Sequence, residues 1–202
     1  MADIKINGNK YNGIERVKFA GADGVSTVSF MDASILENLI TGTLTDVFYD
    51  TQITSIENAN MFRGANIGVI NMPNVKSIAF QAFQSCKATE IRFEGLQTFK
   101  NGSTFLSMPN LTKAVFGTSC MSLPSQCFNA CSKLATLVLP YNGVVSINVT
   151  SSNASLLNTA IANGTGYVYV PSAQVDNYKA DTNWATYADQ IRAIEDYPDE
   201  VA

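Results

Sequence analysis

The sequence predicts a repeat solenoid: a right-handed coil in which short repeated segments stack and form a parallel β-sheet along one face. Three observations predict it: an apolar pattern that recurs along the chain, a phenylalanine column in register with it, and ends that do not follow the pattern. Because the end coils leave apolar edges open, they need caps. We expect a β-meander over residues 1–32, about five to six coils over 33–170, and a helical cap with an acidic tail over 171–202.

The repeat is an apolar pattern of the form L-x-x-L-x-L. Its clearest copy is Leu134, Leu137 and Leu139. The copies begin at Leu44, Ile67, Ala88, Leu111 and Leu134, which are 23, 21, 23 and 23 residues apart. A period of about 20–29 residues is typical of leucine-rich repeats, which contribute one strand per coil. We expect the first, fourth and sixth positions of each copy to point into the core.

Two more columns keep the same register upstream of the strands. One consists of phenylalanines five or six residues before each strand: Phe62, Phe83, Phe105 and Phe128. The other is made of Ile56, Ile78, Phe99 and Leu123. Equivalent positions of stacked coils lie next to one another, so each column should form a continuous row in the interior.

The two ends of the chain have patterns of their own. Asn7-Gly8 and Asp23-Gly24 are turn pairs between alternating apolar residues, which predicts the N-terminal β-meander. Residues 141–166 should form an irregular last coil, with YVYV as the closing strand. Residues 172–195 predict two short helices, the first with Ser172 as its N-cap. One face of the second helix would hold Trp184, Tyr187, Ala188, Ile191 and Ile194.

The charge distribution excludes several classes of protein. Only 15% of the residues are charged, against about 25% in a typical soluble domain. Between residues 101 and 170 the charged side chains are Lys113 and Lys133. A net charge of −4 without a basic cluster argues against a nucleic-acid partner. No apolar stretch reaches the roughly 20 residues of a membrane span, so membrane insertion is not expected.

The cysteines raise the question of a metal site, because Cys127 and Cys131 are four residues apart. A structural zinc site needs a second such pair or histidines, and the chain has no histidine. The four cysteines instead fall in columns that other coils fill mostly with small or apolar residues, which favours buried free thiols. The lack of histidine also excludes a Ser-His or Cys-His nucleophile. We expect neither a metal site nor a cofactor.

Paired carboxylates are the remaining candidates for catalysis. Glu90 and Glu94 flank Arg92 on the outward side of one strand, and two carboxylates can hydrolyse sugars. Neighbouring parallel strands lie about 4.8 Å apart, which should place Glu90 beside Lys113 of the next coil. An ion-paired ladder therefore explains these residues better than acid–base chemistry, and we predict that the protein is not an enzyme.

The outward face of the predicted sheet is the best candidate for a binding surface, since solenoids bind partners along their concave sheet. A solvated face without a ligand is the competing interpretation. The residues of the two outward columns are Asp46, Val69, Glu90, Lys113 and Thr136, and Phe48, Asn71, Arg92, Val115 and Val138. An exposed Phe48 and the Val115–Val138 pair would suit contact with a protein or a glycan.

The segments AFQSCKATEIRF and CFNACSKLATLVLP follow a signature of the form AF-x-x-C-x-x-L-x-x-I-x-L-P. They resemble BspA-like, or Treponema-type, leucine-rich repeats. The segment YVPSAQVDNYKADTNWATYADQIRAI is similar to the terminal cap of such arrays in bacterial and phage proteins. The opening, MADIKINGNKYNGIERVKFAGADGVSTVSFMD, resembles the starts of structural proteins of tailed phages and prophages.

These resemblances imply a non-enzymatic phage or prophage virion protein of the tail, baseplate or capsid surface. Its partners would be other virion proteins, copies of itself, or a glycan or protein of the host surface. The first residues carry no secretory signal; we therefore expect synthesis in the host cytoplasm and placement on the virion. A bacterial cell-surface adhesin is the alternative, and a sugar hydrolase using Glu90 and Glu94 comes third.

Overall fold

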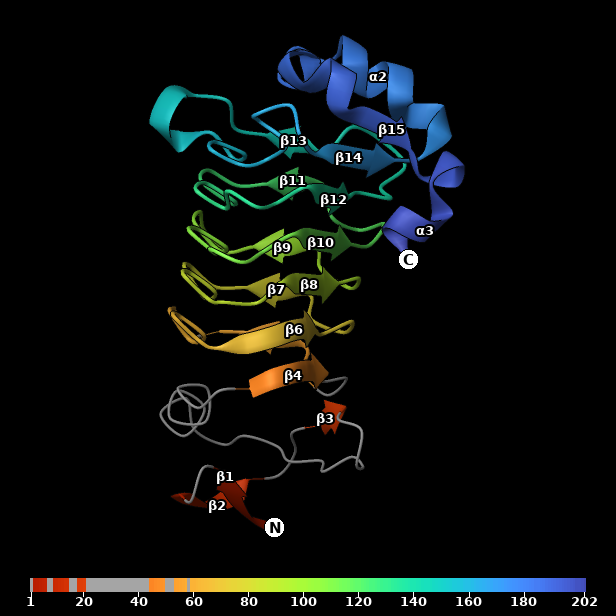
Figure 1. Cartoon of the computed structure of the whole chain (residues 1–202). Helices are drawn as coiled ribbons and strands as arrows, with labels where there is room; N and C mark the ends of the chain where they lie inside the picture. Colours follow the sequence, from red (N-terminus) through yellow and green to blue (C-terminus); the bar gives the residue numbers. More distant parts are fainter. Residues whose placement is uncertain (1, 7–8, 15–17, 21–43, 50–52, 58) are drawn as a thin grey trace.

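The computed structural model describes residues 2–6, 9–14, 18–20, 44–49, 53–57 and 59–202, with side chains from residue 53 onward. In this part of the chain, short coils stack along one axis, and a helical cap lies at the C-terminal end (Figure 1). The expected turn at Asp23-Gly24 lies outside the described residues. The pair Asn7-Gly8 also lies outside them, but β1 (Ala2–Ile6) and β2 (Asn9–Ile14) form an antiparallel pair across it, with Ile6 opposite Asn9.

Among the described residues, the main sheet has eight strands in the order β15-β14-β12-β10-β8-β6-β4-β3. All neighbouring strands are parallel except β3 and β4, which are antiparallel. The strands are β3 (Lys18–Ala20), β4 (Leu44–Tyr49), β6 (Ile67–Asn71), β8 (Glu90–Phe93), β10 (Lys113–Phe116), β12 (Thr136–Val138), β14 (Tyr167–Val170) and β15 (Ile191–Ala193). The sheet thus repeats one strand per coil, as the apolar pattern predicts.

Five of the described coils also contribute a two-residue strand away from the main sheet. These strands are β5 (Ser55–Ile56), β7 (Ser77–Ile78) and β9 (Thr98–Phe99) in one sheet, and β11 (Ser122–Leu123) and β13 (Ser146–Ile147) in another. The pairing is parallel, with Ile56 opposite Ile78 and Ile78 opposite Phe99. Three members of the second predicted column are therefore a row of cross-strand neighbours, whereas the fourth, Leu123, lies opposite Ile147 in the other sheet.

The phenylalanine column is a ladder of stacked rings in the core. Phe62 and Phe83 stack with ring centroids 4.7 Å apart, Phe83 and Phe105 at 5.5 Å, and Phe105 and Phe128 at 5.2 Å. All four side chains are fully buried. Their backbone amides bond the next coil as well; for example, the Phe62 N–H donates to the carbonyl of Ala82 at 2.7 Å.

A tight turn carries each ring of the ladder into the core. The residues two positions before and after each phenylalanine have positive φ: Asn60 and Gly64, Gln81 and Ser85, Ser103 and Ser107, and Gln126 and Ala130. For a residue other than glycine this conformation costs about 1–2 kcal/mol. Ring stacking and inter-coil hydrogen bonds hold it in every coil, so tertiary contacts override local preference in these turns.

The inward positions of the strands are buried as the pattern predicts. Ile70, Ile91, Leu137 and Val168 all have zero exposure. The residues between them on the same strands point to the opposite face of the sheet, because side chains alternate along a strand.

The C-terminal cap differs from the prediction. α2 (Val175–Ala180) is a helix, but the second predicted helix is a 3₁₀ segment over Ala185–Gln190 that ends where β15 begins. The strand forms because β14 would otherwise expose an unpaired edge, and Ile191 takes the position opposite Val168. YVYV forms β14 (Tyr167–Val170), the strand that closes the last coil as predicted, and β15 is a further strand that the prediction did not include. Ser172 also makes no side-chain cap; it begins a 3₁₀ turn, Ser172–Gln174, that Pro171 precedes.

The segment after β15 crosses back over the main sheet. A 3₁₀ turn, Ile194–Asp196, and α3 (Pro198–Val201) bring the chain to the outer side of β12 and β10 (Figure 1). We call residues 194–202 the tail. The outward face of the sheet is thus partly covered by the chain itself.

Candidate functional site

The outward face is built from two cross-strand rows. One row runs from Val69 through Glu90, Lys113 and Thr136 to Tyr167. The other contains Asn71, Arg92, Val115, Val138, Tyr169 and Arg192. The structure thus brings eight of the predicted site residues together, and it places Glu90 directly opposite Lys113.

The register differs at β4, where the prediction placed Asp46 opposite Val69 and Phe48 opposite Asn71. The strand pair is irregular between Leu44 and Val47, and Val47 lies opposite Val69. This shift by one residue places Phe48 opposite Ile70. The two predicted columns therefore do not extend into β4 in the expected register. The sequence did not reveal the irregularity because it lies in the pairing between strands and not in the local apolar pattern.

The apolar half of the face is buried, which corrects the expectation of an exposed Val115–Val138 pair. Val115 is 6% exposed, Val138 4% and Tyr169 2%. Three side chains of the tail pack against them: Ile194, Tyr197 and Val201. In the sequence, these three apolar residues are three and four positions apart within an acidic segment. That pattern could have indicated that the segment packs against an apolar surface.

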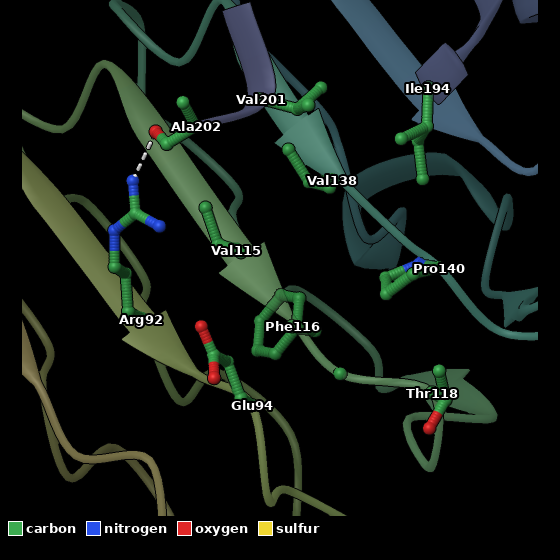
Figure 2. Close-up of a pocket in the computed structure, with 11 residues that line it drawn as sticks. Arg92, Glu94, Val115, Phe116, Thr118, Val138, Pro140, Ile194, Val201 and Ala202 are labelled. Atoms are coloured by element: carbon green, nitrogen blue, oxygen red, sulfur yellow. Dashed lines mark hydrogen bonds between the residues drawn. The ribbon is translucent and has the colours of Figure 1, made fainter. Parts of the chain in front are cut away.

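Polar contacts fix the far end of the tail. The guanidinium of Arg92 and the ammonium of Lys113 both donate to the backbone carbonyl oxygen of Ala202 (Figure 2 shows the Arg92 bond). Arg92 also forms an ion pair with Glu90 on its own strand. The expected ladder between Glu90 and Lys113 is therefore replaced by an Arg92–Glu90 pair and a Lys113–tail contact.

The charges around Lys113 affect its protonation. Desolvation lowers the pKa of Lys113, and the positive charge of Arg92 acts in the same direction. Glu90 and Glu200, an acid of the tail, act in the opposite direction. The tail thus places negative charge near Lys113 and accepts a hydrogen bond from it.

Aromatic contacts hold the start of the tail. The Arg192 guanidinium carbon lies 3.2 Å from the centre of the Tyr167 ring and 4.7 Å from that of Tyr197. Tyr197 also meets Tyr169 edge to face, with centroids 5.8 Å apart. Cation–π contacts of this kind contribute about 0.5–2 kcal/mol, depending on their exposure to solvent.

A groove of about 410 Å³ remains between the tail and the strand ends (Figure 2). Its walls are mainly apolar and its charged lining residues are Arg92 and Glu94; the others are Val115, Phe116, Gly117, Thr118, Val138, Pro140, Ile194, Val201 and Ala202. Glu94 and Thr118 are exposed. This shape can accept an apolar side chain of a partner beside a pair of opposite charges. Of the two carboxylates considered for sugar hydrolysis, Glu94 lines this groove, while Glu90 is held by Arg92.

The cysteines occupy the core. Cys86, Cys120, Cys127 and Cys131 are free thiols and all are buried. Desolvation raises the pKa of Cys86 to about 11 and that of Cys120 and Cys131 to about 12. Among the described residues, no group of three or more metal-ligating side chains is assembled. Likewise, no helix in the described part of the chain is long and apolar enough to cross a membrane.

The thiols give a direct test of this burial. At pH 8 we expect no reaction of the folded protein with a thiol reagent such as DTNB, and reaction of four thiols after unfolding in guanidinium. Rapid labelling of the folded protein at pH 8 would contradict the placement.

The raised pKa values also imply that stability contributed by the protonated thiols is present below about pH 9 and declines above it, because only the unfolded chain ionises there.

Comparison with known proteins agrees with the repeat geometry. Six copies of the BspA type leucine rich repeat region match residues 54–166, more than half of the chain. A comparison with curated proteins gives no significant match. Stacked repeats of this kind present an extended face to partners. The chain therefore belongs to the BspA-type leucine-rich repeat family, a family of protein-interaction modules.

Proposed function

We propose that this protein is a non-enzymatic structural and interaction protein of a phage or prophage particle, and that it contacts its partners through the outward face of the main sheet. The observation that carries the proposal is the groove beside the tail, where apolar walls meet Arg92 and Glu94. This arrangement suits recognition of a protein segment, because an apolar anchor provides binding energy and a flanking charge pair provides orientation.

The composition of the coils supports a role in an assembled particle. Between residues 101 and 170 the only charged side chains are Lys113 and Lys133, and the segment is rich in Ser, Thr and Asn. A surface with few charges packs against neighbours with little desolvation cost. The partners we propose are other virion proteins or copies of this chain, with a glycan or protein of the host surface at the exposed side. Residues 1–32, which resemble the start of phage structural proteins, are proposed to dock the chain on the particle.

The placement is tested by locating the protein. An antibody against the chain should label purified particles in electron micrographs, and mass spectrometry should recover the chain from them. Recovery in the cell-envelope fraction instead would support a bacterial adhesin, the alternative function. Recovery in neither fraction would overturn both.

The docking role of the first segment is tested by deletion. A chain without residues 1–32 should be absent from purified particles while it accumulates, folded, in the same cells. A point variant away from the tail and the outward face, such as Lys179→Gln on the exposed side of α2, is the control and should be incorporated normally. Incorporation of the deleted chain would overturn docking through this segment.

A further inference from the structure

The tail covers the outward face without being part of a coil. Its side chains meet Tyr169 on β14, Val138 on β12 and Val115 on β10, and its last residue reaches Arg92 on β8, 110 positions earlier in the chain. The tail therefore runs past four strands, from β14 to β8. This direction is opposite to the order in which the chain forms the coils. In Figure 1 the tail lies at the side of the stack, below the cap that it leaves.

The contact is limited in depth. Ile194, Tyr197 and Val201 are each only partly buried, whereas the acids Glu195, Asp196, Asp199 and Glu200 are exposed. The secondary structure of the tail is one 3₁₀ turn and one four-residue helix. Segments with few buried apolar contacts open at a lower free energy than the core. We therefore expect the tail to open at a lower free energy than the coils.

The face is complementary to a segment of this composition. The apolar strip of Val115, Val138 and Tyr169 is bordered by three cations: Arg92, Lys113 and Arg192. The tail carries four acids within nine residues. Lys113 is one of only two charged side chains between residues 101 and 170, and it donates to the tail. Glu200 acts electrostatically on Lys113, and the face thus suits an acidic segment with apolar residues at positions 1, 4 and 8.

We propose that the outward face binds the tail of a second copy of this chain, in the same way that it binds its own tail. The inference rests on the proposed function and names one partner of that face. Each copy carries both a face and a tail, so exchange between two copies can re-form the contacts of Tyr197, Val201 and Ala202 with the face of the other copy. A tail on the same chain competes at an effective concentration on the order of millimolar. Exchange is therefore favoured where copies are crowded, as in an assembled array.

Two variants of the full chain separate the halves of this contact. Val138→Asp places a carboxylate in the apolar strip and leaves a working tail. Tyr197→Ser/Val201→Asp removes the apolar anchors of the tail and leaves a working face. Each variant alone should sediment as a monomer, and their mixture should form a one-to-one dimer. The matched control is Val69→Asp, an outward residue away from the tail contacts, which should not dimerise with the tail variant because its own tail stays bound.

A labelled peptide of residues 194–202 measures the same contact without an intact second copy. It should bind the tail variant saturably, and at least tenfold more weakly to the unaltered chain, whose own tail competes. Lys113→Glu in the tail variant should weaken binding about fivefold, and a peptide with Glu200→Lys should restore it. Circular dichroism of each variant establishes that it is folded.

The inference is overturned if folded variants stay monomeric when mixed and the peptide does not bind the tail variant. It is also overturned if the peptide binds the unaltered chain and the tail variant equally, because the tail would then not occupy the binding surface. Either result, together with recovery of the chain in particles, would leave the proposed function standing and assign the face to another partner.

Discussion

Replacing Phe105 by alanine is expected to lower the free energy of unfolding by about 3–5 kcal/mol. The Phe105 ring is fully buried at the centre of the ladder. Its centroid lies 5.5 Å from that of Phe83 and 5.2 Å from that of Phe128, and it also meets the inward side chain Phe93 at 5.7 Å. The variant would leave a cavity between two coils, which the stacked turns cannot close without moving their backbone.

Guanidinium unfolding followed by circular dichroism measures this loss. Because coils contact mainly their neighbours, weakening the central interface is also expected to reduce the cooperativity of the transition. Phe80→Ala is the matched control, since Phe80 is 38% exposed, and its effect should stay within about 0.5 kcal/mol. Equal losses in the two variants would contradict the ladder.

Gly117→Ala is expected to destabilise the protein by about 3 kcal/mol or more, through overpacking. Gly117 follows β10 and is buried beside the groove. A Cβ at this position would lie 1.7 Å from the carbonyl oxygen of Glu94 in the preceding coil. The added Cβ would clash with backbone atoms of the neighbouring coil and not with a movable side chain. The clash can therefore be relieved only if the two coils move apart. The groove and the Arg92 contact to the tail should change as well, because both span these coils.

The comparison variant for Gly117 is Gly64→Ala. Gly64 has a φ of +70°, and no atom lies within 4 Å of the point that an alanine methyl would occupy. Alanine therefore adds backbone strain of about 1–2 kcal/mol but no clash. Thermal unfolding of both variants should show the larger loss for Gly117→Ala. A smaller loss there than at Gly64 would mean that the coils are less closely stacked than the structure shows.

The repeat and its interior could be predicted from particular residues. The period from Ile67 to Leu134 predicts the strands, and the phenylalanines at fixed distance from them predict the ladder. Both signals are local and recur in each coil. Because equivalent positions of stacked coils lie next to one another, the signals also predict which strands pair and which rings stack. The cysteines follow from the same reasoning, since Cys86 and Cys131 are in one column and both are buried.

The cap and the outward face could be predicted only in part. Ile191 and Ile194 have the spacing of a helix face, yet Ile191 pairs with Val168 in the sheet, because an open strand edge outcompetes a short helix. Val115 and Val138 were correctly placed side by side. Their burial depends on tail residues about 55 to 85 positions later, which no local pattern relates to them.

The repeating strand, the aromatic ladder and the membership of the outward rows from β6 to β12 can be predicted from the amino-acid pattern, because each depends on a period that the chain repeats. The register of β4, the formation of β15 and the docking of the tail over Val115 and Val138 depend on contacts that form only in the folded protein. These features occur once each and arise from competition between surfaces for burial and for unpaired backbone groups. A contact that occurs only once leaves no repeated signal in the sequence. Whether it forms depends on which surfaces and backbone groups the folded coils leave exposed.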